Sequence, residues 1–198
     1  MLNKRLLLLA SSLLLAAPMA RAAFQMKSVD DEPVFNYPEI NQGVPVVAVP
    51  QKPAAQSDIW ATLGRFKRHE FREWADDMAI EQLKALDRFA KLWGASVTVS
   101  GSSAALGRKM GKDKLSQHNI DRWGEVRATD VFPKGLTPQN AEYAVTLAKK
   151  AGFSGIGVYL DTSKPMMHLD VRPDRSPFNP ASWARIKGEY VGIERAFA

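Results

Sequence analysis

The sequence of 198 residues contains no cysteine. This absence excludes a disulfide framework, a thiolate metal site, a cysteine nucleophile and a lipid-modified N-terminal cysteine. A metal site in this chain must therefore be built from histidine, aspartate or glutamate. Histidine is itself scarce, with three in the whole chain.

Long apolar runs and basic clusters are also missing from most of the chain. After residue 22 no segment approaches the roughly 20 apolar residues of a membrane span, so we expect no stable span in the mature protein. No run of lysine and arginine with interleaved aromatic residues is present, which argues against nucleic acid as a partner.

The N-terminus has the composition of a secretory signal peptide. Lys4 and Arg5 precede the apolar run LLLLASSLLLAA, and Ala20-Arg21-Ala22 offers small residues at a cleavage site. We therefore expect removal of residues 1–22 and a periplasmic or secreted protein, with an uncleaved anchor as the alternative. Removal would lower the formal net charge from +6 to +3, because 24 basic and 21 acidic residues would remain.

Two further segments follow the signal peptide. Residues 23–56 carry five prolines and no helical period, which predicts an extended tether, although VPVVAVP could instead lie in a groove of the domain.

The pattern of residues 57–198 predicts one α+β domain. Apolar spacing and punctuation by glycine or proline predict helices over residues 80–93 and 138–151. The predicted strands are residues 96–100, 126–132, 155–160 and 166–172, the last two joined as a hairpin.

Polar side chains interrupt two of these strands. His168 and Asp170 share one face of MMHLDVR, because side chains alternate along a strand, and Asp130 interrupts VRATDVF. Together with His118, Asp130 and His168 form a set that could bind one metal ion. Zinc with three protein ligands leaves a fourth position for water and lowers the pKa of that water to about 7. From the residues alone, Asp130 could instead cap a turn or pair with Arg127.

The order of these motifs resembles the zinc D-Ala-D-Ala carboxypeptidase family, which includes phage peptidoglycan endopeptidases and has hedgehog-type domains as distant relatives. The resemblance covers about residues 65–190. The family's sequence pattern is S-x-H, then a G-x-A-x-D strand, then an aromatic-rich strand and a hairpin with H-x-D. The matching positions are Ser116, His118, Ala128, Asp130, Gly155, Gly157, Tyr159, His168 and Asp170.

The resemblance implies a zinc peptidase that hydrolyses peptidoglycan stem peptides, with a small antiparallel sheet, flanking helices and Zn²⁺ on one sheet face. It makes His118, Asp130 and His168 the zinc ligands. Asp170 would orient an imidazole or form a salt bridge with Arg172 or Arg185 on the strand surface. Ser116 would hydrogen-bond near the site or cap the turn.

The chain departs from the family pattern at two substrate-contacting positions. Twelve residues separate His118 from Asp130, which is more than the family usually has, so residues 119–127 include an insertion. Trp123 in this insertion would form a wall of the substrate cleft, or pack in the core or against a lid. Arg108 follows the Ser-Gly strand later than the family's arginine, and it would bind a substrate carboxylate or be solvated.

The third departure concerns the general base. Pro165 and Met166 stand where relatives place a proton acceptor, and neither can move a proton. Asp161 is the first predicted substitute and Glu125 the second. Without a base, the alternative is a non-catalytic zinc-binding domain of cell-wall or phage origin.

Overall fold

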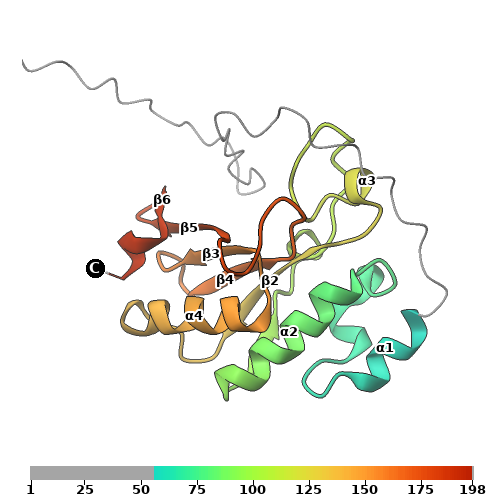
Figure 1. Cartoon of the computed structure of the whole chain (residues 1–198), viewed down its shortest axis with the longest axis horizontal. Helices are drawn as coiled ribbons and strands as arrows, with labels where there is room; N and C mark the ends of the chain where they lie inside the picture. The colour runs from blue at the N-terminus through green and yellow to red at the C-terminus, as the bar shows by residue number, and fades with distance from the viewer. Residues whose placement is uncertain (1–55, 198) are drawn as a thin grey trace, which may run out of the picture. The chain divides into compact units, whose positions relative to one another are not determined.

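The computed structural model describes residues 56–197. The predicted signal peptide and all but the last residue of the predicted tether lie outside the described residues. Six strands form one sheet, in the order β1-β2-β4-β3-β5-β6 (Figure 1). The strands are β1 (Val97–Val99), β2 (Ala128–Pro133), β3 (Gly155–Tyr159), β4 (Met166–Asp170), β5 (Ala181–Ile186) and β6 (Glu189–Gly192).

Two helices pack side by side on one face of this sheet (Figure 1). The predicted helix over residues 80–93 is confirmed as α2 (Ile80–Trp93), which ends at Gly94 with a left-handed φ of 78°. The second predicted helix is divided into η3 (Pro138–Asn140) and α4 (Ala141–Ala151). The remaining helical segments are short: α1 (Gln56–Thr62), η1 (Arg68–Trp74), η2 (Ser103–Ala105), α3 (Ile120–Trp123) and η4 (Ile193–Ala196).

The hydrophobic core lies between α2, α4 and the sheet. Val131, Met167 and Leu169 are fully buried there, beside Leu86 and Phe89 of α2. Because side chains alternate along a strand, the intervening residues of β2 and β4 face away from both helices. That second sheet face is therefore available for a functional site. Within residues 56–197, no helix is long and apolar enough to cross a membrane.

The prediction of an α+β fold with flanking helices is confirmed, but the prediction of an antiparallel sheet is wrong. β3 and β4 form the predicted hairpin, whereas β3 and β5 pair in parallel. The chain leaves β4 beside Gly155 and enters β5 beside the same residue. Residues 171–180 therefore cross the end of β3 and set β5 on its other side.

Candidate metal centre

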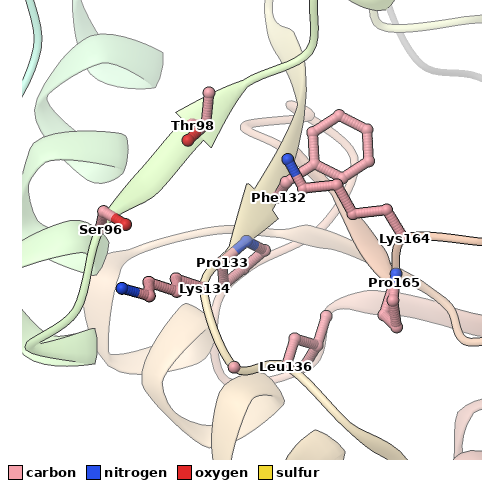
Figure 2. A pocket seen from close by; sticks show the side chains of 9 residues that line it. Ser96, Thr98, Phe132, Pro133, Lys134, Leu136, Lys164 and Pro165 are labelled. Atoms are coloured by element: carbon pink, nitrogen blue, oxygen red, sulfur yellow. The ribbon is translucent and has the colours of Figure 1, made fainter.

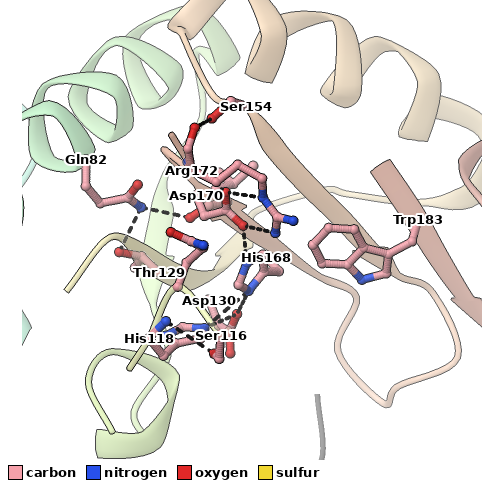
Figure 3. A network of polar contacts seen from close by, with 12 residues as sticks. Gln82, Ser116, His118, Thr129, Asp130, Ser154, His168, Asp170, Arg172 and Trp183 are labelled. Carbon is pink, nitrogen blue, oxygen red and sulfur yellow. Dashed lines mark hydrogen bonds and ion pairs between the residues drawn. The ribbon is translucent and has the colours of Figure 1, made fainter. Parts of the chain in front are cut away.

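Neighbouring strands bring Asp130 and His168 together. They form a register pair between β2 and β4, and Ala128 opposes Asp170 two residues further along. Asp130, His168 and Asp170 therefore project from the same sheet face. His118 approaches this face from the segment between β1 and β2 (Figure 3). Its carbonyl accepts a 2.8 Å hydrogen bond from the Arg108 N–H.

Three side-chain atoms of these residues converge on one point. His118 Nε2 lies 3.2 Å from His168 Nδ1, and Asp130 Oδ1 lies 3.1 Å from His168 Nδ1 and 3.6 Å from His118 Nε2. Tetrahedral zinc with ligands at roughly 2.0–2.1 Å separates its ligand atoms by about 3.3 Å. The dimensions of the triad therefore suit a bound metal ion.

The other nitrogen of each imidazole is already hydrogen-bonded. His118 Nδ1 lies 2.5 Å from the Leu106 carbonyl oxygen, and His168 Nε2 lies 2.9 Å from Asp170 Oδ2. Both oxygens can only accept, so these two nitrogens carry the protons. In the neutral rings His118 Nε2 and His168 Nδ1 then present lone pairs toward each other and toward Asp130. Either a proton on one imidazole or a metal ion would relieve the repulsion of three lone pairs that face one point, and a buried His118–Asp130–His168 group could bind a metal ion.

Burial and charge fix the ionisation of the two aspartates. Burial raises the pKa of Asp130, but the charge and hydrogen bonds of His118 and His168 in their protonated form outweigh it and lower that pKa below its usual value. Burial likewise raises the pKa of Asp170, but the Arg172 guanidinium and its hydrogen bonds lower it to about 2. Both side chains are therefore carboxylates at neutral pH.

Asp170 has both of its predicted contacts at once. Besides His168, it binds Arg172, whose Nε and Nη2 lie 2.9 and 2.5 Å from its two oxygens. The guanidinium also lies 5.5 Å from the ring centroid of Trp183. The result is a buried chain from Arg172 through Asp170 to His168, which fixes the orientation of that imidazole.

Two glycines of β3 make room for this arrangement. A Cβ on Gly155 would overlap the Asp170 carboxylate, and a Cβ on Gly157 would lie 2.6 Å from the Trp183 indole. Trp183 in turn lies with its ring centroid 5.2 Å from that of His168. The glycines that matched the family pattern therefore have a steric reason to be glycine.

The predicted residues around the triad have different positions. Ser116 lies beside it, where its Oγ accepts a 3.3 Å hydrogen bond from the His118 N–H. Arg108 supports the His118 segment through its backbone N–H, which donates to the His118 carbonyl, while its Nε donates to the Ala104 carbonyl at 2.7 Å. Trp123 in α3 is half-buried and donates to the Ser116 carbonyl at 2.8 Å, so it packs the insertion against the His118 turn.

Neither predicted base is brought to the triad. Asp161 accepts a 2.5 Å hydrogen bond from the Gly188 N–H in the β5–β6 turn. It follows Gly157, the residue opposite His168, by four positions, or about 13 Å along a strand. Glu125 forms a 3.0 Å ion pair with Arg127, and burial raises its pKa.

The sequence interpretation did not identify the contributions of Trp183 and the Leu106 carbonyl. Trp183 reaches His168 only because β5 pairs in parallel with β3, with Trp183 opposite Gly157. A backbone carbonyl leaves no signal in a single sequence. The alternation in SWARI could have indicated a strand with Trp183 facing one side.

Comparisons with known proteins identify no relative. No family model, no curated protein and no solved structure matches this chain.

Proposed function

We propose that the triad binds zinc and that the protein is an exported zinc peptidase acting on peptidoglycan stem peptides. The observation that carries the proposal is the converging set of His118 Nε2, His168 Nδ1 and Asp130 Oδ1, with both remaining imidazole nitrogens engaged. Carboxylate–histidine pairs of this kind orient and strengthen metal ligands. The substrate class rests on the motif resemblance.

The number of ligands favours catalysis over a structural metal. Structural zinc sites use four protein ligands, whereas catalytic sites use three and leave one position open. The cluster in the described part of the chain has three members, and the remaining histidine, His69, is exposed in η1. Bound zinc would polarise a scissile carbonyl and activate water. Of the triad side chains, that of Asp130 keeps 12% of its area exposed and that of His118 none, so solvent reaches the triad beside Asp130.

A non-catalytic zinc-binding domain is the second candidate. It is favoured by the positions of Asp161 and Glu125, because hydrolysis needs a proton acceptor within hydrogen-bond reach of the reacting water. Asp161 is bound at the β5–β6 turn, and Glu125 is paired with Arg127. The two candidates share the metal and differ in turnover.

Metal analysis of the purified protein tests the first step. We expect about one zinc per chain, and loss of most of it in His118→Ala and His168→Ala, as a three-ligand site requires. His69→Ala is the matched control and should retain wild-type zinc. Full retention in both triad variants would refute the ligand assignment.

Turnover is tested on stem peptides with the zinc-loaded protein and mass spectrometry. Cleavage that is lost in His168→Ala and retained in His69→Ala supports the peptidase, and the product masses identify the bond that is cut. Stoichiometric zinc without any cleavage supports the non-catalytic domain.

Export is tested separately, by N-terminal sequencing. The exported protein should begin at Ala23, directly after the proposed cleavage site. A membrane-bound product that begins at Met1 would contradict export by a cleaved signal.

A further inference from the structure

A hollow of about 320 Å³ opens where β1 begins and β2 ends (Figure 2). We call it the lysine pocket and define it by Ser96, Thr98, Phe132, Lys134, Lys164 and Pro165. Its lining combines two ammonium groups and two hydroxyl groups with an aromatic ring and a proline. Hydrogen-bond donors beside an apolar floor suit an anionic group attached to an apolar body.

The charge of the lysine pocket is not neutralised from within the domain. Lys134 and Lys164 are exposed. Within residues 56–197, no carboxylate lies within 4.0 Å of either ammonium group. Lys164 Nζ lies 4.4 Å from the ring centroid of Phe132, a cation–π contact that positions the ammonium over the ring.

The lysine pocket lies on the same sheet face as the triad. Phe132 follows Asp130 by two residues in β2, so both side chains project to one side, and Thr98 of β1 opposes Phe132. Two strand residues span about 7 Å, which is also the span of two residues of an extended peptide. An extended peptide with one residue at the triad would therefore place the residue two positions further along beside Phe132 and Lys164.

We propose that the lysine pocket binds a carboxylate of the peptide substrate, two residues away from the bond positioned at the triad. This inference rests on the proposed peptidase function and specifies its substrate as an acidic peptide. Lys164 supplies the contacting charge over the Phe132 ring, and Lys134 with the Ser96 and Thr98 hydroxyls supplies further donors.

Binding of uncleavable peptides to the zinc-loaded protein tests the inference without turnover. Each peptide has a ketomethylene group in place of the scissile amide, an N-terminal fluorophore, and a C-terminal carboxylate or amide two residues beyond that group. Fluorescence anisotropy gives Kd. We expect the carboxylate peptide to bind about fivefold more tightly than the amide peptide, the effect of one solvent-accessible ion pair.

Matched lysine variants locate the effect. Lys164→Met keeps an apolar stem over Phe132 and removes the charge, so the fivefold preference should fall to about one. Lys84→Met, at an exposed position of α2, should keep it. Equal affinity of the two peptides for the wild-type protein would overturn the inference, as would equal effects of the two variants. Displacement by inorganic phosphate as effective as displacement by unlabelled carboxylate peptide would overturn the peptide assignment.

The result is separable from the outcome for the proposed function. A zinc-binding domain without turnover could still prefer the carboxylate peptide, which would refute the peptidase and keep the lysine pocket. Cleavage of stem peptides without any carboxylate preference would keep the peptidase and overturn the lysine pocket.

Discussion

Replacing Asp170 by asparagine tests the link between the buried ion pair and the metal ligands. In the wild-type protein the carboxylate accepts from His168 Nε2, from two guanidinium nitrogens of Arg172 and from the Arg172 N–H. Asparagine has the same shape but presents an amide NH₂ in place of one accepting oxygen. One of the donors of His168 or Arg172 would therefore face another donor.

The structure sets the magnitudes. Loss of a carboxylate that orients a metal-bound imidazole typically weakens metal affinity about 10–100-fold. Breaking a buried ion pair costs about 3–5 kcal/mol, and the Arg172 side chain keeps 15% of its area exposed, so we expect about 3 kcal/mol. Asp170→Asn should therefore bind zinc at least tenfold more weakly and lose about 3 kcal/mol of unfolding free energy.

Two measurements and two controls separate these effects. Competition with a chromophoric chelator gives the zinc affinity, and urea denaturation gives the unfolding free energy. Arg172→Met leaves the bond between Asp170 and His168, so it should lose stability but keep zinc affinity within about threefold, well short of the 10–100-fold loss for a missing carboxylate partner. Asp174→Asn, in an exposed loop, should change neither. Wild-type zinc affinity in folded Asp170→Asn would refute the reasoning.

Three further predictions follow from the contacts around the site. Gly157→Ala should destabilise the fold by about 1–3 kcal/mol, because its Cβ would meet the Trp183 indole at 2.6 Å. Gly101→Ala, whose Cβ would lie 3.6 Å from the nearest side-chain atom, is the control. Equal urea midpoints for the two variants would contradict the steric account. Asp161→Asn should keep turnover within about twofold, a small fraction of the 10²–10⁴-fold effect of a general base, since its carboxylate binds the β5–β6 turn; a loss approaching 10²-fold in the peptide assay would return it to the mechanism. Burial raises the folded-state pKa of Glu125, so its ionisation lowers the unfolding free energy as pH rises from its unfolded pKa through the folded one. Glu125→Gln cannot ionise, so urea unfolding should show its unfolding free energy rising relative to that of the wild type between pH 4 and pH 7. A difference that does not change with pH would contradict this.

Local sequence patterns were sufficient for α2 and for the β3–β4 hairpin. The apolar repeat from Ile80 to Trp93 has the period of a helix, and Gly94 ends it because only glycine adopts a left-handed φ of 78° without strain. His168 and Asp170 could be placed on one strand face because the alternation of side chains is a local property. Predicting the candidate metal triad also required the ordered series of motifs, because His118 lies in an irregular segment that has no periodic pattern.

Non-local pairing was beyond the same patterns. The partner of β5 is decided by how residues 171–180 cross the sheet, and no residue in that segment specifies a parallel pair with β3. The position of Trp183 at His168 depends on that pairing. The β5–β6 turn does have a local signal, the dipeptide Lys187-Gly188. Lys187 and Gly188 have φ of 52° and 80°, as a two-residue hairpin loop requires.

Between β1 and β2, the chain has only short helical turns and no strand of the sheet. His118 reaches two strands from this segment, so a bound ion would join this segment to β2 and β4. Ligand binding to the folded state adds about 2.7 kcal/mol at a free concentration 100 times Kd. Without the ion the segment would lose this stabilisation, and proteases cut segments that open locally. If the protein is exported and binds zinc as proposed, its lifetime would then depend on the local supply of zinc.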